Sequence, residues 1–290
     1  MRANAPPVNA LAEARSYCRA LARAHYENFT VASWLLPGRL RPHFYSIYAY
    51  CRVADDLADE TGDPHRALAL LDEWEGELQR CYRGEARQPV FVALAETIAA
   101  FDIPVDPFLS LLTAFRQDQR VTRYRTFADL LGYCRHSADP VGHLVLYLCG
   151  YRDPERRRLA DCTCTALQLT NFWQDIGVDL AKGRVYLPQE DLDRFGCTEE
   201  GIRERRFDAA FAALVRFEVE RTRALFREGA PLGVMVERRL RRGIDLFAQG
   251  GLAILRRIER QGYDVLTHRP ALSRARKAAL IAGRILSGIR

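Results

Sequence analysis

Apolar side chains recur at every third or fourth position along most of the chain, the spacing that places them on one face of an α-helix. Glycine and proline interrupt this pattern at short intervals, for example at Pro37-Gly38, Arg83-Gly84 and Asp139-Pro140, as is typical of helix ends and short connections. No alternating run between turn dipeptides favours a β-sheet. The pattern therefore predicts an all-α protein with about ten or more helices.

The interruptions divide the chain into helices of ordinary length. Pro140 removes a backbone donor and disfavours helical geometry at Asp139, so a helix should stop or kink there. The highly charged stretch 118–125 is expected to be a connection. No glycine- or serine-rich linker occurs, so residues 1–290 are predicted to form one domain. Helices are expected over residues 8–25, 39–59, 64–82, 88–117 with a break at Pro104, 154–180, two within 198–261, and an amphipathic segment over 270–290.

The composition is that of an ordinary globular protein, with 48% hydrophobic and 28% charged residues among 290. No apolar run approaches the ~20 residues of a membrane-spanning helix, and residues 1–10 contain no apolar signal-peptide core. We therefore expect a cytoplasmic protein. The eight cysteines show no C-x-x-C and no zinc-like spacing, and we expect them to be reduced core residues.

The net charge of +6 rests mostly on arginine. Basic proteins bind nucleic acid, anionic membranes or anionic substrates, but no nucleic-acid motif occurs here and the arginines are interleaved with acidic residues. A solvated helix face is the favoured interpretation, and nucleic acid is not an expected partner. The arginine-rich amphipathic segments are also compatible with peripheral contact at the inner face of the membrane.

Two pairs of aspartates, Asp55 with Asp59 and Asp175 with Asp179, each stand four residues apart. On a helix this spacing places both carboxylates on one face, one turn apart, where like charges repel unless a cation lies between them. Oxygen ligands on a rigid scaffold suit Mg²⁺, which usually shares its coordination shell with waters and substrate phosphates. The two pairs therefore predict a cleft that holds several Mg²⁺ ions and a diphosphate.

The first pair shares its helical stripe with Tyr48 and Arg52, at spacings of four, three and four. An arginine guanidinium suits bidentate contact with phosphate. Asp55 and Asp59 also lie at the end of the predicted helix, where the macrodipole disfavours anions. A solvated helix tip is the alternative interpretation, but a sequence that breaks a local rule in this way often does so at a functional site.

The second pair shares its stripe with Gln168 and Asn171, so that a buried helix would carry a continuous polar face. Unpaired buried polar atoms cost about 1–3 kcal/mol each, and a metal with its waters would satisfy them. Lys182, Arg184 and Tyr186 follow at once, where a loop would fold back over bound phosphate. His136 is interpreted as structural, because a lone histidine beside a kink seldom has a catalytic role.

Together the two motifs resemble those of the squalene/phytoene synthase family, and the likeness covers about residues 17–269. The resemblance implies a single isoprenoid-synthase helical bundle with a central cavity, acting on a prenyl diphosphate. It also implies Mg²⁺ held by Asp55, Asp59, Asn171, Asp175 and Asp179, diphosphate contacts from Tyr48, Arg52, Asn171, Arg184 and Tyr186, and a prenyl pocket lined by Phe29, Tyr133, Val141, Gly142 and Gln168.

Within that family, members that condense two prenyl diphosphates commonly read His-Ser-x-Ser-Phe where this chain reads His25-Tyr26-Glu27-Asn28-Phe29. This stretch, together with residues 31–33 and 137–142, is similar to the hydroxysqualene synthases of bacterial hopanoid pathways. The resemblance implies that presqualene diphosphate loses diphosphate and that water captures the rearranged cation, with Tyr26, Asn28 or Tyr133 positioning the water. No G-x-G-x-x-G fingerprint occurs, which fits a product made without reduction.

Three alternatives remain open. The first is a condensing enzyme that makes presqualene diphosphate, dehydrosqualene or phytoene. The second is a catalytically inactive helical scaffold, and the third is a basic adaptor for membranes or nucleic acid. An inactive scaffold would be expected to have lost a motif aspartate, and none is lost. An adaptor would bind in a strongly salt-dependent way without Mg²⁺-dependent turnover. The favoured interpretation predicts other enzymes of squalene and hopanoid synthesis as pathway partners.

Overall fold

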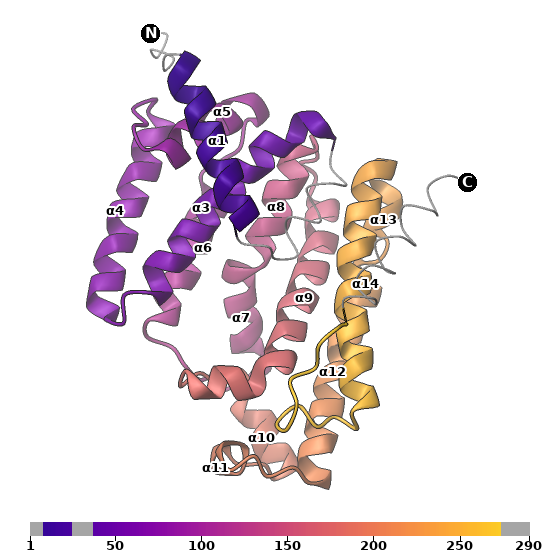
Figure 1. Ribbon diagram of the computed structural model, residues 1–290. Coiled ribbons are helices and arrows are strands. Elements are labelled where there is room, and N and C mark those ends of the chain that lie inside the picture. Colours follow the sequence, from indigo (N-terminus) through magenta and orange to yellow (C-terminus); the bar gives the residue numbers. More distant parts are fainter. Residues whose placement is uncertain (1–7, 25–36, 274–290) are drawn as a thin grey trace. The chain divides into compact units, whose positions relative to one another are not determined.

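The computed structural model describes residues 8–24 and 37–273, and within these ranges the chain is built from helices (Figure 1). The only pairing of extended residues in the described ranges is an isolated parallel bridge between Arg123 and Val185. The all-α prediction is confirmed. None of the described helices combines the length and apolarity needed to cross a bilayer.

The chain divides into two compact units, the first made of residues 1–120 and 140–157 and the second of residues 121–139 and 158–290. The prediction of one domain therefore stays a prediction. The first unit contains α1 (Val8–Ala24), the 3-10 helix η1 (Gly38–Leu40), α3 (Arg41–Asp59), α4 (Pro64–Tyr82), α5 (Pro89–Phe101), α6 (Asp106–Asp118) and nearly all of α8 (Asp139–Leu148).

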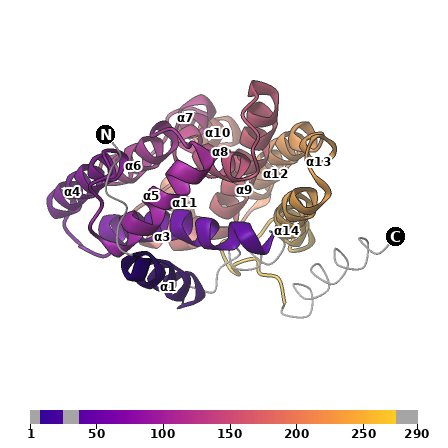
Figure 2. The ribbon, with the colours of Figure 1, turned by 90° about the horizontal axis from the view of Figure 1, so that it is seen from above.

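Helix α3 is the centre of the first unit and packs against α1, α4, α5 and α6, as the two views of the ribbon show (Figures 1 and 2). Its fully buried Tyr50 contacts the rings of Trp74, Phe91 and Phe108 at centroid distances of 5.9, 6.0 and 5.0 Å. The Tyr50 hydroxyl donates to the Phe108 carbonyl over 3.2 Å. This aromatic packing fixes the rotation of α3 and therefore the face on which Arg52 and the first aspartate pair lie.

The second unit is built around α9 (Pro154–Ala181), which carries the second aspartate pair. Its fully buried Trp173 donates through Nε1 to Thr222 Oγ1 of α12 (Ala209–Gly229) over 2.8 Å, which satisfies the indole inside the core. The second unit contains α7 (Phe127–Ser137), most of α9 (Pro154–Ala181), α10 (Gln189–Phe195), α11 (Glu199–Arg203), α12 (Ala209–Gly229), α13 (Leu232–Met235) and α14 (Arg238–Arg260).

The helix predictions agree with the structure wherever the apolar pattern is long. Helix α4 has the predicted bounds, α9 ends one residue beyond the predicted end, and the predicted stop near Pro140 falls at Ala138, between α7 and α8. The short helices α10, α11 and α13 were not predicted, and the first of the two long helices expected within 198–261 begins only at Ala209. Of the amphipathic segment expected over 270–290, residues 270–273 are not helical and residues 274–290 lie outside the described ranges. All eight cysteines are free, as expected, and three of them are buried: Cys18, Cys81 and Cys134.

Candidate active site

The first aspartate pair lies in the last two turns of α3, in the first unit, with Asp59 exposed and the Asp55 side chain 46% exposed. Arg52 donates through Nη1 to Asp55 Oδ2 over 3.2 Å and also forms an ion pair with Asp56. Asp56 was not predicted as part of the site, although it stands four residues after Arg52, where helical side chains meet. This end of α3 therefore carries three carboxylates and one guanidinium.

The second aspartate pair lies on α9, in the second unit, one helical turn apart. Asp175 and Asp179 are both half-buried, Gln168 is half-buried, and Asn171 is exposed. The polar stripe was expected to be buried, but it is only half-buried and water reaches this face of α9. The stripe itself is present, and its carboxylates are accessible to a ligand.

Asp179 has an unfavourable environment for a negative charge. Burial, and next the charge of Asp175, raise the pKa of the Asp179 carboxyl to about 6, against smaller opposite effects of Lys182, Arg184 and Arg269. Two half-buried carboxylates one turn apart are costly together, and a bound cation would remove that cost. The second pair therefore has the character of a cation site.

Arg269, after the end of α14, already supplies one positive charge to this pair. Its guanidinium binds both oxygens of Asp175, Nε contacting Oδ1 and Nη2 contacting Oδ2 at 3.0 Å. The two residues are 94 positions apart, so no local spacing in the sequence predicts this contact. Only the folded chain brings Arg269 into the candidate site.

The loop after α9 is held in place by backbone hydrogen bonds. The Arg184 amide donates to the Asp179 carbonyl over 2.8 Å, and the Val185 amide donates to the Thr122 carbonyl over 2.9 Å. Arg123 donates through Nη1 to the carbonyl of Gly183 over 2.5 Å. Thr122 and Arg123, within the stretch 118–125 that was expected to be only a connection, therefore pair with the loop that carries Arg184.

Four aromatic rings pack beside this loop, and we call them the aromatic cluster: Tyr124, Tyr133, Phe172 and Tyr186. The rings of Phe172 and Tyr186 are stacked with centroids 3.8 Å apart. Tyr133 lies 5.6 Å from Tyr124, 6.1 Å from Phe172 and 6.0 Å from Tyr186. Tyr133 and Tyr186 were predicted site residues. Phe172 was missed because an aromatic residue at helical spacing usually indicates a core, and Tyr124 was missed because it lies in the charged stretch expected to be a connection.

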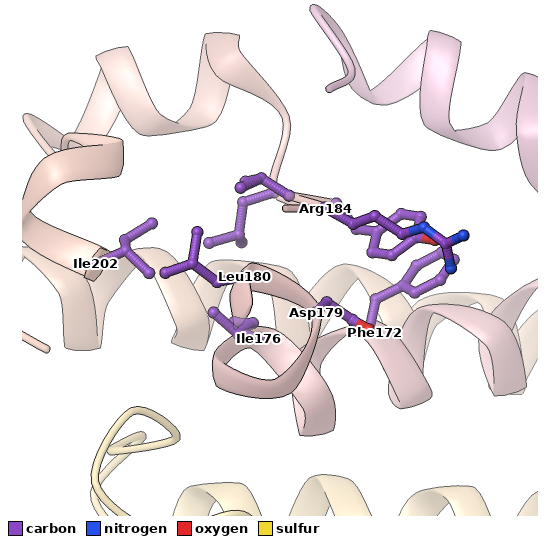
Figure 3. Close-up of a pocket in the computed structure, with 9 residues that line it drawn as sticks. Phe172, Ile176, Asp179, Leu180, Arg184 and Ile202 are labelled. Carbon is purple, nitrogen blue, oxygen red and sulfur yellow. The ribbon is translucent and has the colours of Figure 1, made fainter. Parts of the chain in front are cut away.

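A narrow crevice separates the end of α9 from the loop that follows it. Figure 3 shows Asp179, Arg184 and the Phe172 ring toward one end of the crevice and Ile202 toward the other, with Ile176 between them. Its interior volume of about 10 Å³ is enough for about one water molecule. The crevice does not hold a prenyl chain in this form.

The remaining predicted site residues fall in several places. Tyr48 of α3 is buried, one turn before Arg52. Val141 and Gly142 lie half-buried in the first turn of α8, in the first unit, whereas Tyr133 belongs to the second unit. Tyr26, Asn28 and Phe29 lie outside the described residues.

The donors present fit Mg²⁺ as an ion that is shared with a phosphate ligand. Within residues 8–24 and 37–273, no three or more His, Cys, Asp or Glu side chains converge into a complete metal site. Each aspartate pair offers only hard carboxylate oxygens, the donors that Mg²⁺ prefers, and leaves most of the coordination shell to water and phosphate. Asp175 demonstrably accepts a cation, because it binds the Arg269 guanidinium.

Comparison with known proteins identifies the class to which this fold and site belong. The family model for squalene/phytoene synthase matches residues 22–276. The chain therefore belongs to the squalene/phytoene synthase family, whose members are synthases that process prenyl diphosphates.

Solved structures and curated relatives refine this placement. A crystal structure of squalene synthase HpnC from Alicyclobacillus acidocaldarius is 51% identical, with a TM-score of 0.84 over 89% of this chain and 97% of that one. A dehydrosqualene synthase is 26% identical, with a TM-score of 0.87 over 97% and 98% of the two chains. A 15-cis-phytoene synthase of Synechococcus elongatus is 32% identical over 75% of each chain. The isoprenoid-synthase fold implied by the resemblance is thereby confirmed.

Proposed function

We propose that this protein converts presqualene diphosphate and water into hydroxysqualene and diphosphate in a Mg²⁺-dependent reaction. The observation that carries the proposal is the graded similarity to relatives. Identity is 51% to squalene synthase HpnC, against 32% to a phytoene synthase and 26% to a dehydrosqualene synthase. The chain thus lies nearer to a protein of squalene formation than to these condensing relatives.

The roles proposed for the aspartates follow from their chemistry. Asp55, Asp59, Asp175 and Asp179, with Asn171, would hold Mg²⁺ against the substrate diphosphate. When bound, the metal supplies positive charge that offsets the charge developing on the leaving diphosphate.

The basic and aromatic residues around these aspartates would bind and orient the diphosphate. Arg52 and Arg184 would donate to its oxygens, and Arg184 suits this role because its backbone is already hydrogen-bonded to Asp179. Tyr48 and Tyr186 would complete the diphosphate contacts. Gln168, Val141, Gly142 and Phe29 would line the prenyl part of the substrate.

The reaction breaks the bond between carbon and the diphosphate oxygen, and the electron pair leaves with the diphosphate. The cyclopropylcarbinyl cation rearranges, water adds to one carbon, and the proton of that water is released. The aromatic cluster offers ring faces that stabilise positive charge without reacting with it. Tyr133, a member of the cluster, or Tyr26 or Asn28 would position the water.

Two other products have specific support. The name of the 51% identical structure, squalene synthase, favours reductive formation of squalene with a nicotinamide donor. The names of the phytoene synthase relatives favour head-to-head condensation of two prenyl diphosphates. All three reactions begin with loss of diphosphate, so the aspartates and arginines would have the same roles in each.

Product analysis with the purified protein and Mg²⁺ tests the proposal. One reaction receives presqualene diphosphate alone, a second receives presqualene diphosphate with NADPH, and a third and fourth receive farnesyl or geranylgeranyl diphosphate. We expect hydroxysqualene in the first two reactions, with the alcohol oxygen derived from ¹⁸O-labelled water, and no condensation product in the others. Squalene only in the second reaction, or condensation in the third or fourth, would overturn the proposal in favour of the corresponding alternative.

A further inference from the structure

The ion pair between Arg269 and Asp175 is made by a segment after α14 that is itself anchored to the protein by buried residues. We call residues 261–270 the strap. Val265, Leu266 and Pro270 of the strap are buried, whereas the Arg269 side chain is 54% exposed. The strap is therefore anchored by its apolar residues, and its arginine points to the acidic face of α9.

Hydrogen bonds fix the shape of the strap in its middle and at Pro270. Asp264 Oδ1 accepts from the amides of Leu266 and Thr267 over 3.2 and 2.9 Å, which closes a tight turn. Gln174 of α9 donates through Nε2 to the carbonyl of Pro270 over 2.5 Å. Gln174 directly precedes Asp175, so this hydrogen bond ties the strap to α9 next to the arginine contact.

The guanidinium and a metal ion would compete for the same atoms. Arg269 engages both carboxylate oxygens of Asp175, so a metal that coordinates either oxygen must share that atom with the guanidinium. The arginine charge would also repel a divalent ion nearby. We propose that Arg269 is a resident cation of the second aspartate pair, which holds Asp175 in the metal-free protein and weakens binding of the metal to that pair.

This inference rests on the proposed function, because it requires a metal at Asp175 and Asp179. It adds a role for a residue outside both acidic motifs. Since a half-exposed ion pair contributes little by itself, the expected change in metal dissociation constant on removing the arginine is about three- to tenfold. Thermodynamic linkage makes the effect reciprocal, so metal binding should also loosen the strap.

Direct metal binding tests the competition without turnover. Mn²⁺, which accepts the same oxygen ligands as Mg²⁺, is titrated into substrate-free protein and followed by electron paramagnetic resonance. The background variant carries Asp55→Asn and Asp59→Asn, so that the second pair alone is observed. We expect Arg269→Gln to lower the Mn²⁺ dissociation constant about three- to tenfold, and Arg269→Lys, which keeps the charge but loses the bidentate contact, to lower it less.

The matched control is Arg206→Gln, which removes the same charge from an exposed ion pair with Glu204 in the same unit. The Mn²⁺ dissociation constant of the background variant that also carries Arg206→Gln should equal that of the background variant alone. An equal decrease in Arg206→Gln and Arg269→Gln would overturn the inference, because net charge alone would then explain it. If adding Asp175→Asn and Asp179→Asn to the background leaves Mn²⁺ binding unchanged, the proposed metal site itself fails. If those substitutions abolish binding but Arg269→Gln has no effect, only the role of Arg269 fails.

Hydrogen exchange of the strap supplies an independent readout. We expect saturating Mg²⁺ to speed amide exchange over residues 264–270 in the otherwise unchanged protein. In Arg269→Gln the exchange should already be fast and should not respond to metal. Exchange that is unaffected or slowed by Mg²⁺ in the unchanged protein would contradict competition between the metal and the arginine.

Discussion

The ring of Tyr186 lies flat on the ring of Phe172, with 3.8 Å between the centroids and 7° between the planes. Tyr186 belongs to the loop after α9, and Phe172 belongs to α9 itself. The stack therefore docks the loop on the helix that carries the second aspartate pair. Arg184, two residues before Tyr186, is placed beside Asp179 as a result.

Replacing the ring at Tyr186 should affect both stability and turnover. Tyr186→Ala removes the stack, and we expect a loss of about 2 kcal/mol in the free energy of unfolding. The melting temperature should fall by about 4–8 °C, as calorimetry would measure. Because Arg184 loses its support, kcat/KM for the diphosphate substrate should fall about 10- to 100-fold. Tyr186→Phe keeps the ring and is the control for stability. Unchanged kcat/KM in Tyr186→Ala would contradict a positioning role for the stack.

Removing the charge of Asp179 should separate activity from stability. We expect Asp179→Asn to lower kcat/KM at least about 100-fold, since charge stabilisation of the leaving group is lost. The metal-free protein should melt at the same or a higher temperature, because a half-buried carboxylate beside Asp175 is replaced by a neutral amide.

The matched control for this change is Asp193→Asn. Asp193 is an exposed carboxylate on α10 that accepts from Gln189 at the surface. Its substitution should leave both activity and melting temperature nearly unchanged. Full turnover in Asp179→Asn, measured at saturating Mg²⁺, would exclude Asp179 from the metal site.

Local patterns in the sequence were sufficient to predict the long helices and to place the two aspartates of each pair on one helical face. An apolar period repeated over α4 or α9 specifies a helix whatever its neighbours are, and two residues four apart share a helical face. Helix α11 has only five residues, and its start depends on a single cap, in which Thr198 Oγ1 accepts from the Gly201 amide. Such short helices contain too few periods for the pattern to detect.

Spacing in the sequence could not predict the contacts between segments that are far apart along the chain. Arg123 and Gly183 meet because two irregular loops run side by side, and a charged connection gives no sign of this. Arg269 reaches Asp175 only because α14 returns the chain to α9. The chemical types of these residues were visible in the sequence, but their partners depend on the tertiary fold.

A buried charge cluster in the second unit predicts a specific pH dependence of stability. Glu218 is fully buried and Asp191 is nearly so. Arg221 donates to both carboxylates, with one Nη2 contact of 2.6 Å to each. Burial is the largest cause that raises the pKa of Glu218 to about 8, with Arg221 opposing the shift and Asp191 adding to it.

The sign of the effect follows from proton binding. Between the ordinary pKa of glutamate, 4.5, and about 8, the folded state holds a proton on Glu218 that the unfolded state releases. The contribution of Glu218 to the free energy of unfolding is therefore complete below pH 4.5 and is lost as the pH rises toward 8. Glu218→Gln should remove this slope, as urea denaturation at pH 5, 6, 7 and 8 would measure. Glu220→Gln, at a surface pair with Arg223, is the control and should keep the slope. A Glu218→Gln profile parallel to that of the unchanged protein would contradict the assignment.

The close packing of α12 on α9 at Gly229 gives the last prediction. A Cβ at Gly229 would lie 2.9 Å from the carbonyl oxygen of Leu159 and would also collide with Thr163 Oγ1. The Leu159 carbonyl is backbone and cannot turn aside, so the two helices must separate. Gly229→Ala should therefore lower the free energy of unfolding by about 1–3 kcal/mol.

Gly76, inside α4, is the matched glycine for this test. A Cβ there would meet only the far end of the Arg80 side chain, at 3.9 Å. Gly76→Ala should raise the free energy of unfolding by about 0.5–1 kcal/mol, because alanine loses less backbone entropy on folding. Urea denaturation of both variants measures the two effects under the same conditions. If both alanines stabilised the protein, α12 and α9 would not be in the close contact that the buried Gly229 allows.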